Sequence, residues 1–236
     1  MVNLMSEKDS VSLIESMVTW QGEGPSCGKR MLLLRFKTCD RVEERKPCHF
    51  CDTLVRMRTS TEFKVELDKI QEIINTEKAG LMITGGEPTY KHNFTETLQL
   101  LTLLDYPIAN VETNGHNLLK LIQATKDLDK NIQFIFSPKF FNAEEKFKAL
   151  EVLASVIHDR RVFIKYVVDN EQSADNFLTK LFDENSSKLD LNQRVYLMPE
   201  GKTLESMIKN SGIVFDMCET FKTQFSSRDH IVFQFV

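Results

Sequence analysis

The sequence lacks any apolar run long enough to cross a bilayer. A membrane-spanning helix needs about 20 consecutive apolar residues, and aliphatic runs such as residues 31–34 are far shorter. Residues 1–10 carry charged side chains and no apolar core, so they do not read as a secretory signal. We therefore expect a cytoplasmic protein that has no membrane partner.

The chain also lacks the positive charge that is typical of nucleic-acid-binding domains. Its 236 residues include 30 Lys and Arg against 34 Asp and Glu, a formal net charge of −4. We therefore expect no direct contact with nucleic acid. Residues 29–64 have a local charge of the opposite sign, with ten Lys or Arg and five Asp or Glu. That segment is either a solvated basic face or a docking surface for an anionic partner.

Signs of a disulfide scaffold and of a domain boundary are missing as well. Five cysteines are an odd number in a chain of this length, which argues for a reducing compartment. Cys27 and Cys218 have no readable metal role, and we expect both to be buried apolar residues. No linker rich in Pro, Gly or Ser divides the sequence, so residues 1–236 are expected to form a single domain.

Strand patterns alternate with helix patterns along most of the chain. Near-continuous apolar segments, typical of strands covered on both faces, occur at 31–36, 80–84, 108–112, 132–136, 162–168 and 195–198. Amphipathic segments that predict helices occur at 65–76, 93–104, 117–127, 143–157 and 173–183. About six parallel βα units in this length predict an α/β fold built as a partial, open TIM-like barrel, because a closed barrel needs about 250 residues. A doubly wound sheet is the competing architecture, and an extra N-terminal strand is predicted at 11–19.

Three cysteines, Cys39, Cys48 and Cys51, lie within 13 residues in a C-x8-C-x2-C pattern after the first barrel strand. A C-x2-C pair in a tight turn directs both sulfurs to one metal, and the third can join from the preceding loop. Structural zinc needs four ligands, and His49 could nominally complete such a set, although adjacent side chains diverge. Three thiolates without an obvious fourth suit an iron–sulfur cluster with one open iron. Spacing alone leaves a cluster, a zinc site and unliganded cysteines open.

A second motif follows at the end of the next barrel strand, where residues 84–88 read TGGEP. On its own, Gly-Gly at a strand end is most often a turn. Together with the clustered cysteines, it resembles the radical S-adenosylmethionine superfamily, whose usual cysteine spacing is C-x3-C-x2-C. The first gap here has eight residues, so residues 41–47 are expected to form an insertion that modifies the cluster loop.

Further segments narrow the resemblance. The sequence reads WQGEG at 20–24, ETNG at 112–115, SPK at 137–139 and LMPEG at 197–201. With Arg35 and residues 51–53, these are similar in type and order to the 7-carboxy-7-deazaguanine synthases, which make the deazapurine core of queuosine and related bases. The resemblance covers about residues 11–201 and implies a homodimeric enzyme.

The resemblance implies a cofactor site. Cys39, Cys48 and Cys51 would hold a [4Fe–4S] cluster, leaving one iron for S-adenosylmethionine. Gly86 would allow close backbone approach of that cofactor, because glycine has no Cβ. Thr53 would bind Mg²⁺ through its hydroxyl oxygen. The other cofactor contacts, besides Cys51 itself, would come from Phe50, Asp52, Ser137, Pro138 and Lys139.

The implied substrate contacts are Trp20, Gln21, Gly22, Arg35 and Thr84. Arg35 would take the substrate carboxylate through a bidentate, charge-assisted pair. Without the resemblance, Arg35 reads as a surface or salt-bridged arginine, Trp20 as a core residue and Thr53 as a turn residue. Glu112 and Glu200 are weaker candidates.

By resemblance, the substrate is 6-carboxy-5,6,7,8-tetrahydropterin. Hydrogen abstraction by a 5′-deoxyadenosyl radical, ring contraction and loss of ammonia would give 7-carboxy-7-deazaguanine. A flavodoxin-type reductant would dock near the cluster, and residues 29–64 are the candidate face. Two alternatives stay open. A glycyl-radical-enzyme activase would share the cluster but would not need Arg35, and a zinc-stabilised binding module would use the cysteines structurally.

Overall fold

The computed structural model describes residues 9–49, 51, 53–185 and 190–235. Its main sheet has eight strands in the order β10-β9-β8-β7-β6-β5-β3-β2. All neighbours are parallel except β2, which pairs antiparallel with β3 at the edge. The strands are β2 (Glu15–Trp20), β3 (Arg30–Phe36), β5 (Gly80–Gly85), β6 (Ala109–Thr113), β7 (Ile132–Phe136), β8 (Val162–Val168), β9 (Val195–Pro199) and β10 (Gln224–Phe225).

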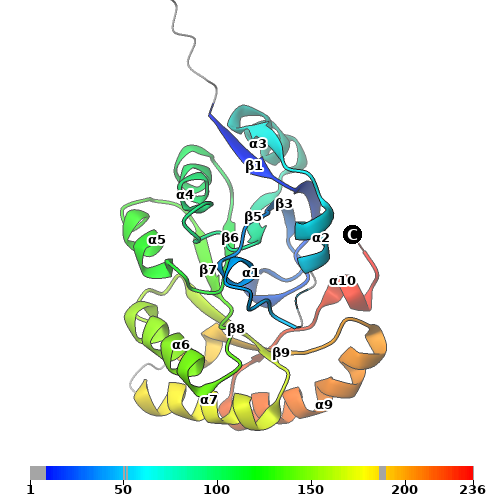
Figure 1. The fold of residues 1–236 in the computed structure, drawn as a ribbon, viewed down its shortest axis with the longest axis vertical. Coiled ribbons are helices and arrows are strands. Elements are labelled where there is room, and N and C mark those ends of the chain that lie inside the picture. The colour runs from blue at the N-terminus through cyan, green and yellow to red at the C-terminus, as the bar shows by residue number, and fades with distance from the viewer. Residues whose placement is uncertain (1–8, 50, 52, 186–189, 236) are drawn as a thin grey trace, which may run out of the picture.

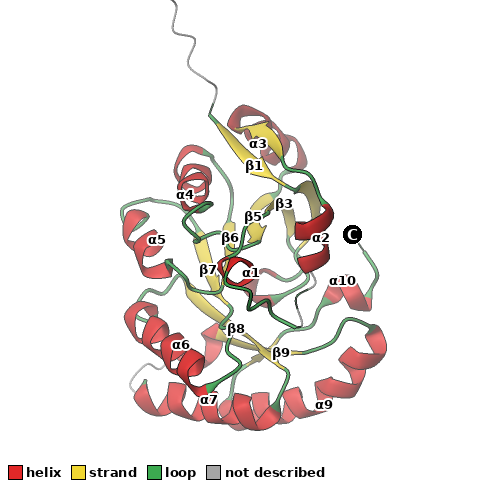
Figure 2. Ribbon diagram, viewed as in Figure 1, coloured by secondary structure: helices red, strands yellow, loops and turns green. Residues whose placement is uncertain are grey.

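Helices cover the outer face of this curved sheet (Figures 1 and 2). Six parallel strands from β3 to β9 are each followed by a helix, which confirms the predicted α/β open barrel. The covering helices are α3 (Leu67–Glu77), α4 (Phe94–Leu103), α5 (Leu118–Ala124), α6 (Ala143–Val156), α7 (Glu171–Glu184) and α9 (Leu204–Phe221). In the parts of the chain that the structure describes, no helix has the length and apolarity to cross a membrane.

Shorter elements fill the loops at both ends of the sheet. They are the 3₁₀ helix η1 (Gly24–Ser26), α1 (Asp40–Glu43), α2 (Leu54–Thr59), α8 (Leu191–Arg194) and α10 (Asp229–Val232). The helix starts follow local chemistry: the Asn142 side chain accepts from the Glu145 amide at the start of α6, and Thr203 and Ser206 cap each other at the start of α9. The helix α1 overlaps the expected insertion at residues 41–47, so the insertion contains most of a one-turn helix.

The predicted N-terminal strand at 11–19 is wrong as a single element. The chain changes partner at Ile14: β1 (Ser10–Leu13) pairs with β4 (Phe63–Glu66) in a separate two-stranded sheet, whereas β2 pairs with β3. The helix predicted at 65–76 begins only at Leu67 for the same reason, because the preceding residues belong to β4.

The two faces of the barrel strands differ in character. On β3, Leu32, Leu34 and Phe36 join the core beneath the helices, while Met31 and Leu33 belong to a smaller cluster on the opposite face. Alternate residues share a face, so Arg35 follows Leu33 on that inner face at the carboxyl end of the strand. The inner face of β3 therefore changes from apolar to polar where the strand ends.

Candidate active site

A cavity of about 420 Å³ opens at the carboxyl ends of the strands, a volume suited to a small organic ligand. Most of the predicted site residues line it. They are Trp20, Gln21, Gly22, Arg35, Cys39, Cys48, Cys51, Thr53, Thr84, Gly86, Ser137 and Lys139. Pro138 does not line the cavity, and Phe50 and Asp52 lie outside the described residues.

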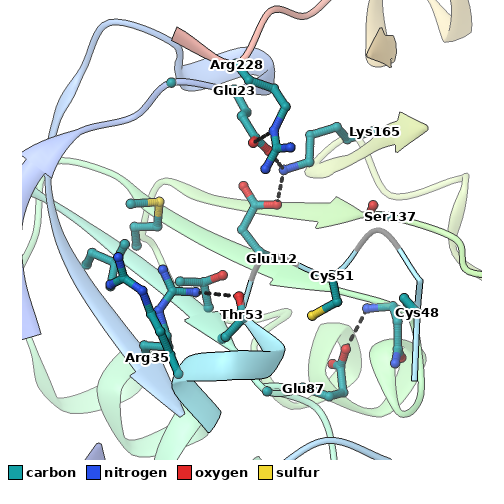
Figure 3. A pocket seen from close by; sticks show the side chains of 18 of the residues that line it. Glu23, Arg35, Cys48, Cys51, Thr53, Glu87, Glu112, Ser137, Lys165 and Arg228 are labelled. Carbon is teal, nitrogen blue, oxygen red and sulfur yellow. Dashed lines mark hydrogen bonds and ion pairs between the residues drawn. The ribbon is translucent and has the colours of Figure 1, made fainter. Parts of the chain in front are cut away.

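The three clustered cysteines line the cavity, and Figure 3 shows two of them, Cys48 and Cys51. The Cys51 amide donates to the Cys48 carbonyl at 3.2 Å, which closes the C-x2-C turn. All three are free and partly buried. Burial, with the charge of Asp40, raises the pKa of Cys39 to about 12, and burial also raises the pKa of Cys48. Metal binding would have to displace the thiol protons.

The structure does not place His49 with the three cysteines in the cavity wall. Among the described residues, no group of three or more His, Cys, Asp or Glu side chains is arranged to hold a metal ion. His49 has a side chain that is 61% exposed, with Nε2 3.4 Å from Asp169. The three cysteines thus line the cavity without His49, and their side chains are not gathered into a metal-binding arrangement. Cys27, expected to be buried, is exposed and donates to Asp229, whereas Cys218 is buried as predicted.

The Gly-Gly segment (Gly85 and Gly86) packs directly on the start of the cysteine loop, the loop after β3 that carries the three clustered cysteines. Gly85 and Gly86 have φ values of +69° and +32°. A Cβ added to Gly86 would lie 2.0 Å from the Thr38 carbonyl oxygen, which accepts from the Glu87 amide at 2.8 Å. The absence of a side chain at Gly86 is thus required by the packing of the two loops.

Replacing Gly86 by alanine is expected to destabilise the protein by about 2 kcal/mol more than replacing Gly28. Gly28 is the matched control, because its φ is +80° but a Cβ there would meet nothing within 4 Å. Both variants pay for a strained φ, and Gly86→Ala must also displace the Thr38 carbonyl. Urea unfolding of the apoprotein measures the difference, and equal losses would contradict it.

Glu87 follows Gly86 and is 1% exposed. Its carboxylate accepts from Thr89, from the Thr113 hydroxyl and from the Asn114 amide. Burial raises the pKa of Glu87, and these hydrogen bonds only partly oppose it. Glu87 therefore ties together the loops that follow β5 and β6 in the cavity wall.

Arg35, Glu15 and Thr53 form a polar group at the edge formed by β2 and β3. Glu15 and Arg35 are direct cross-strand partners, and Arg35 Nε donates to Glu15 Oε2 at 2.6 Å. Arg35 Nη1 donates to Thr53 Oγ1 at 3.0 Å. Thr84 is the register partner of Arg35 on β5. The guanidinium, the hydroxyl of Thr53 and Thr84 thus line one part of the cavity.

The loop after β7 supplies a second polar group. Lys139 Nζ donates to Ser137 Oγ at 2.7 Å. Burial lowers the pKa of Lys139, although the nearby Cys48, Glu23 and Glu112 oppose the effect. Arg41, from the insertion, donates to the Lys139 carbonyl at 3.2 Å. The insertion therefore contacts the segment predicted to hold S-adenosylmethionine.

The cavity wall contains a group of buried charged residues. None of them was predicted as a site residue except Glu112, which was a weaker candidate. Lys165 bridges Glu23 and Glu112, and Arg228 donates to Glu23 (Figure 3). Burial alone would raise the pKa of Glu23, but Lys165 and Arg228 outweigh it and hold the pKa well below its usual range. A lysine inside the apolar segment 162–168 was the available signal, because a charge there needs a partner.

The tail beyond residue 201 closes the cavity near the Gln21–Gly24 turn. The Asp229 amide donates to the Gly22 carbonyl at 3.0 Å, and the Gly24 amide donates to Ser226 Oγ at 2.8 Å. Phe235 and His230 line the cavity. Trp20, which without the resemblance reads as a core residue, is 49% exposed and lines the cavity.

Comparison with known proteins places the chain near one group of enzymes. A 7-carboxy-7-deazaguanine synthase of Clostridium acetobutylicum is 29% identical over 105 residues, 44% of this chain and 45% of that protein. A synthase of Geobacter sulfurreducens is 26% identical over 189 residues, 70% of this chain and 72% of that protein. The first alignment thus spans less than half of its relative.

Among solved structures, QueE from Escherichia coli matches with a TM-score of 0.58 at 19% identity, covering 92% of this chain and 93% of that one. No protein-family profile matches the chain. The chain is therefore distantly homologous to 7-carboxy-7-deazaguanine synthases and shares the fold of QueE.

Proposed function

We propose that this chain is a radical S-adenosylmethionine enzyme that converts 6-carboxy-5,6,7,8-tetrahydropterin into 7-carboxy-7-deazaguanine with loss of ammonia. One observation carries the proposal: a single cavity joins the three cysteines, the Gly85-Gly86 segment and a wall containing Arg35 and Thr84. Distant homology to the synthases supports the same reaction.

The cysteine end of the cavity would hold the cofactors. Cys39, Cys48 and Cys51 would bind a [4Fe–4S] cluster, which when loaded would supply the electron for reductive cleavage of S-adenosylmethionine. Ser137 and Lys139 would hold the cofactor through their linked hydroxyl and ammonium groups. Phe50, Asp52, Gly86 and Pro138 stay predicted contacts.

The opposite part of the cavity would orient the substrate. Arg35 would bind the substrate carboxylate, and Glu15 on its Nε would keep the guanidinium in place. Thr53 would give Mg²⁺ one hard oxygen next to that carboxylate. Thr84, Trp20, Gln21 and Gly22 would border the ring, and the carboxylates of Glu23 and Glu112 would accept hydrogen bonds from its N–H groups.

Anaerobic reconstitution with iron and sulfide tests the proposal directly. The loaded enzyme, given S-adenosylmethionine, a chemical reductant, Mg²⁺ and the carboxytetrahydropterin, is expected to form 7-carboxy-7-deazaguanine. Cleavage of S-adenosylmethionine that leaves the pterin unused would reject this substrate and leave the activase alternative. A protein that binds zinc in place of iron and sulfide would contradict the proposed enzyme function and leave the zinc-stabilised binding module.

A flavodoxin-type reductant is the proposed protein partner, together with a second copy of the chain. Lys46 is exposed in the cysteine loop, within the basic segment. We expect Lys46→Glu to lower flavodoxin-driven turnover roughly threefold to tenfold through slower association. Turnover with a chemical reductant should not change.

Lys126→Glu is the matched control for this charge reversal. Lys126 is also exposed, and it follows α5 on the way to β7, at the end of the barrel away from the cavity. Equal flavodoxin-driven rates for the two variants would argue against docking on the cysteine loop.

A further inference from the structure

Lys165 occupies an unusual position for a lysine. It lies in the middle of β8, and its side chain is only 7% exposed. Its Nζ is 2.6 Å from Glu23 Oε2 and 2.6 Å from Glu112 Oε2. Figure 3 shows the ammonium between the two carboxylates. Burial of such a charge is costly unless it is paired and hydrogen-bonded, and here both conditions are met.

The two carboxylates differ in what holds their other oxygens. Glu23 Oε1 accepts from Arg228 Nε at 3.0 Å, so Glu23 has a second cation. Glu112 Oε1 accepts from the uncharged amide of Gln21 at 3.1 Å. Glu112 therefore depends on Lys165 for counter-charge more than Glu23 does.

Other charged groups face this pair from neighbouring elements. His230, in the tail, has Nε2 3.9 Å from Glu23 Oε1. Lys139, after β7, interacts electrostatically with Glu23, Glu112 and Lys165. Burial alone would lower the pKa of Lys165, but Glu112 and Glu23 outweigh it and raise the pKa above its usual range. Lys165 thus stays charged at any pH at which the enzyme would work.

We propose that Lys165 is a positioning and specificity-determining residue that keeps Glu112 ionised and aimed into the cavity. An ionised carboxylate only accepts hydrogen bonds, whereas a protonated one also donates. Lys165 thereby makes this wall select a heterocycle that presents N–H donors, and it disfavours rings that present acceptors there. The inference rests on the proposed function for the identity of the ring.

The first test needs no cofactor. In the apoprotein, Lys165→Met is expected to leave the carboxylate pair with one extra proton near neutral pH, which appears as a protonated-carboxyl band in infrared spectra. The wild type, whose buried Glu87 has a raised pKa, is the baseline spectrum. The added band should be absent from Lys165→Arg and from the double variant Lys165→Met/Glu112→Gln. A Lys165→Met protein without this band would overturn the proposal.

The second test measures equilibrium binding of 6-carboxy-5,6,7,8-tetrahydropterin to reconstituted enzyme with S-adenosylmethionine and no reductant. We expect Lys165→Met to bind at least about tenfold more weakly than wild type at pH 7. The ratio of variant to wild-type dissociation constants should fall as the pH rises, because the pair then loses its extra proton. Lys165→Arg should restore affinity.

A double-mutant cycle separates this role from a merely structural one. In the Glu112→Gln background, removing Lys165 should change affinity little and independently of pH. A loss as large as in the wild-type background would overturn the proposal. If Lys165→Met does not fold, the double variant decides, since the proposal expects it to fold and its unfolding would indicate a structural role. A wild type that does not bind the pterin would instead reject the proposed function.

Discussion

Replacing Cys51 by alanine is expected to abolish formation of 7-carboxy-7-deazaguanine. Two thiolates from the C-x2-C turn and one from Cys39 are the smallest set that can hold a four-iron cluster with one open iron. The Cys51 amide closes the turn on Cys48, so alanine keeps the backbone and removes only the sulfur. Iron and sulfide content after reconstitution, the visible absorption of the cluster and product formation should all fall together.

Cys218→Ala is the control for this loss. Cys218 is free and buried in α9, and it is not among the residues that line the cavity. The variant should load iron and sulfide as the wild type does. A Cys51→Ala protein with full cluster content would mean that the cysteine loop is not the cluster site.

Arg35→Ala is expected to lower kcat/KM for the pterin by roughly 10²–10³-fold. Losing a partly buried arginine that pairs with a substrate carboxylate costs about 3–4 kcal/mol, and each 1.36 kcal/mol is a factor of ten. Glu15 would keep its other partner, Arg56, so the strand pair should survive. Cleavage of S-adenosylmethionine without pterin should persist, because the cysteine end of the cavity is untouched.

Arg30→Ala is the matched control on the same strand. Arg30 begins β3, pairs with Glu77 and is 43% exposed in its side chain. Its loss should leave pterin turnover within about twofold of wild type, since exposed ion pairs contribute little. If Arg35→Ala turned over the pterin normally, the substrate carboxylate would have to bind elsewhere, and the proposed orientation would be wrong.

The barrel could be predicted because its strands carry a strong local signal. Runs of β-branched and aromatic residues bounded by polar turns gave β7 and β8 with their observed limits. The break at Ile14 could not be predicted in this way. It results from pairing of β1 with β4, about 50 residues later in the chain, and periodicity within a segment does not indicate its partner.

The residues of the candidate site also fall into two groups: those that a local sequence pattern indicates and those that depend on contacts between distant segments. Residues in short motifs after the strands, such as Cys48 and Gly86, could be proposed as site candidates because each motif is local, and both line the cavity. Lys165 is the one charged residue of β8, and Glu112 lies near the end of β6. Their contact depends on which face each strand turns inward. Two-residue alternation does carry that information, since Leu33 and Arg35 share the inner face of β3. The contact between Arg228 and Glu23 has no local pattern.

The contact between Glu23 and Arg228 can form only late in the synthesis of the chain. Glu23 and Arg228 are 205 positions apart, so the ribosome must add the whole barrel after Glu23 before its second cation exists. Contacts of such sequence separation form late and slowly. During synthesis the cysteine loop and the Gly-Gly segment can pack on each other well before Glu23 gains this partner. In the nascent chain, the contact between the cysteine loop and the Gly-Gly segment therefore becomes possible before the contact between Glu23 and Arg228.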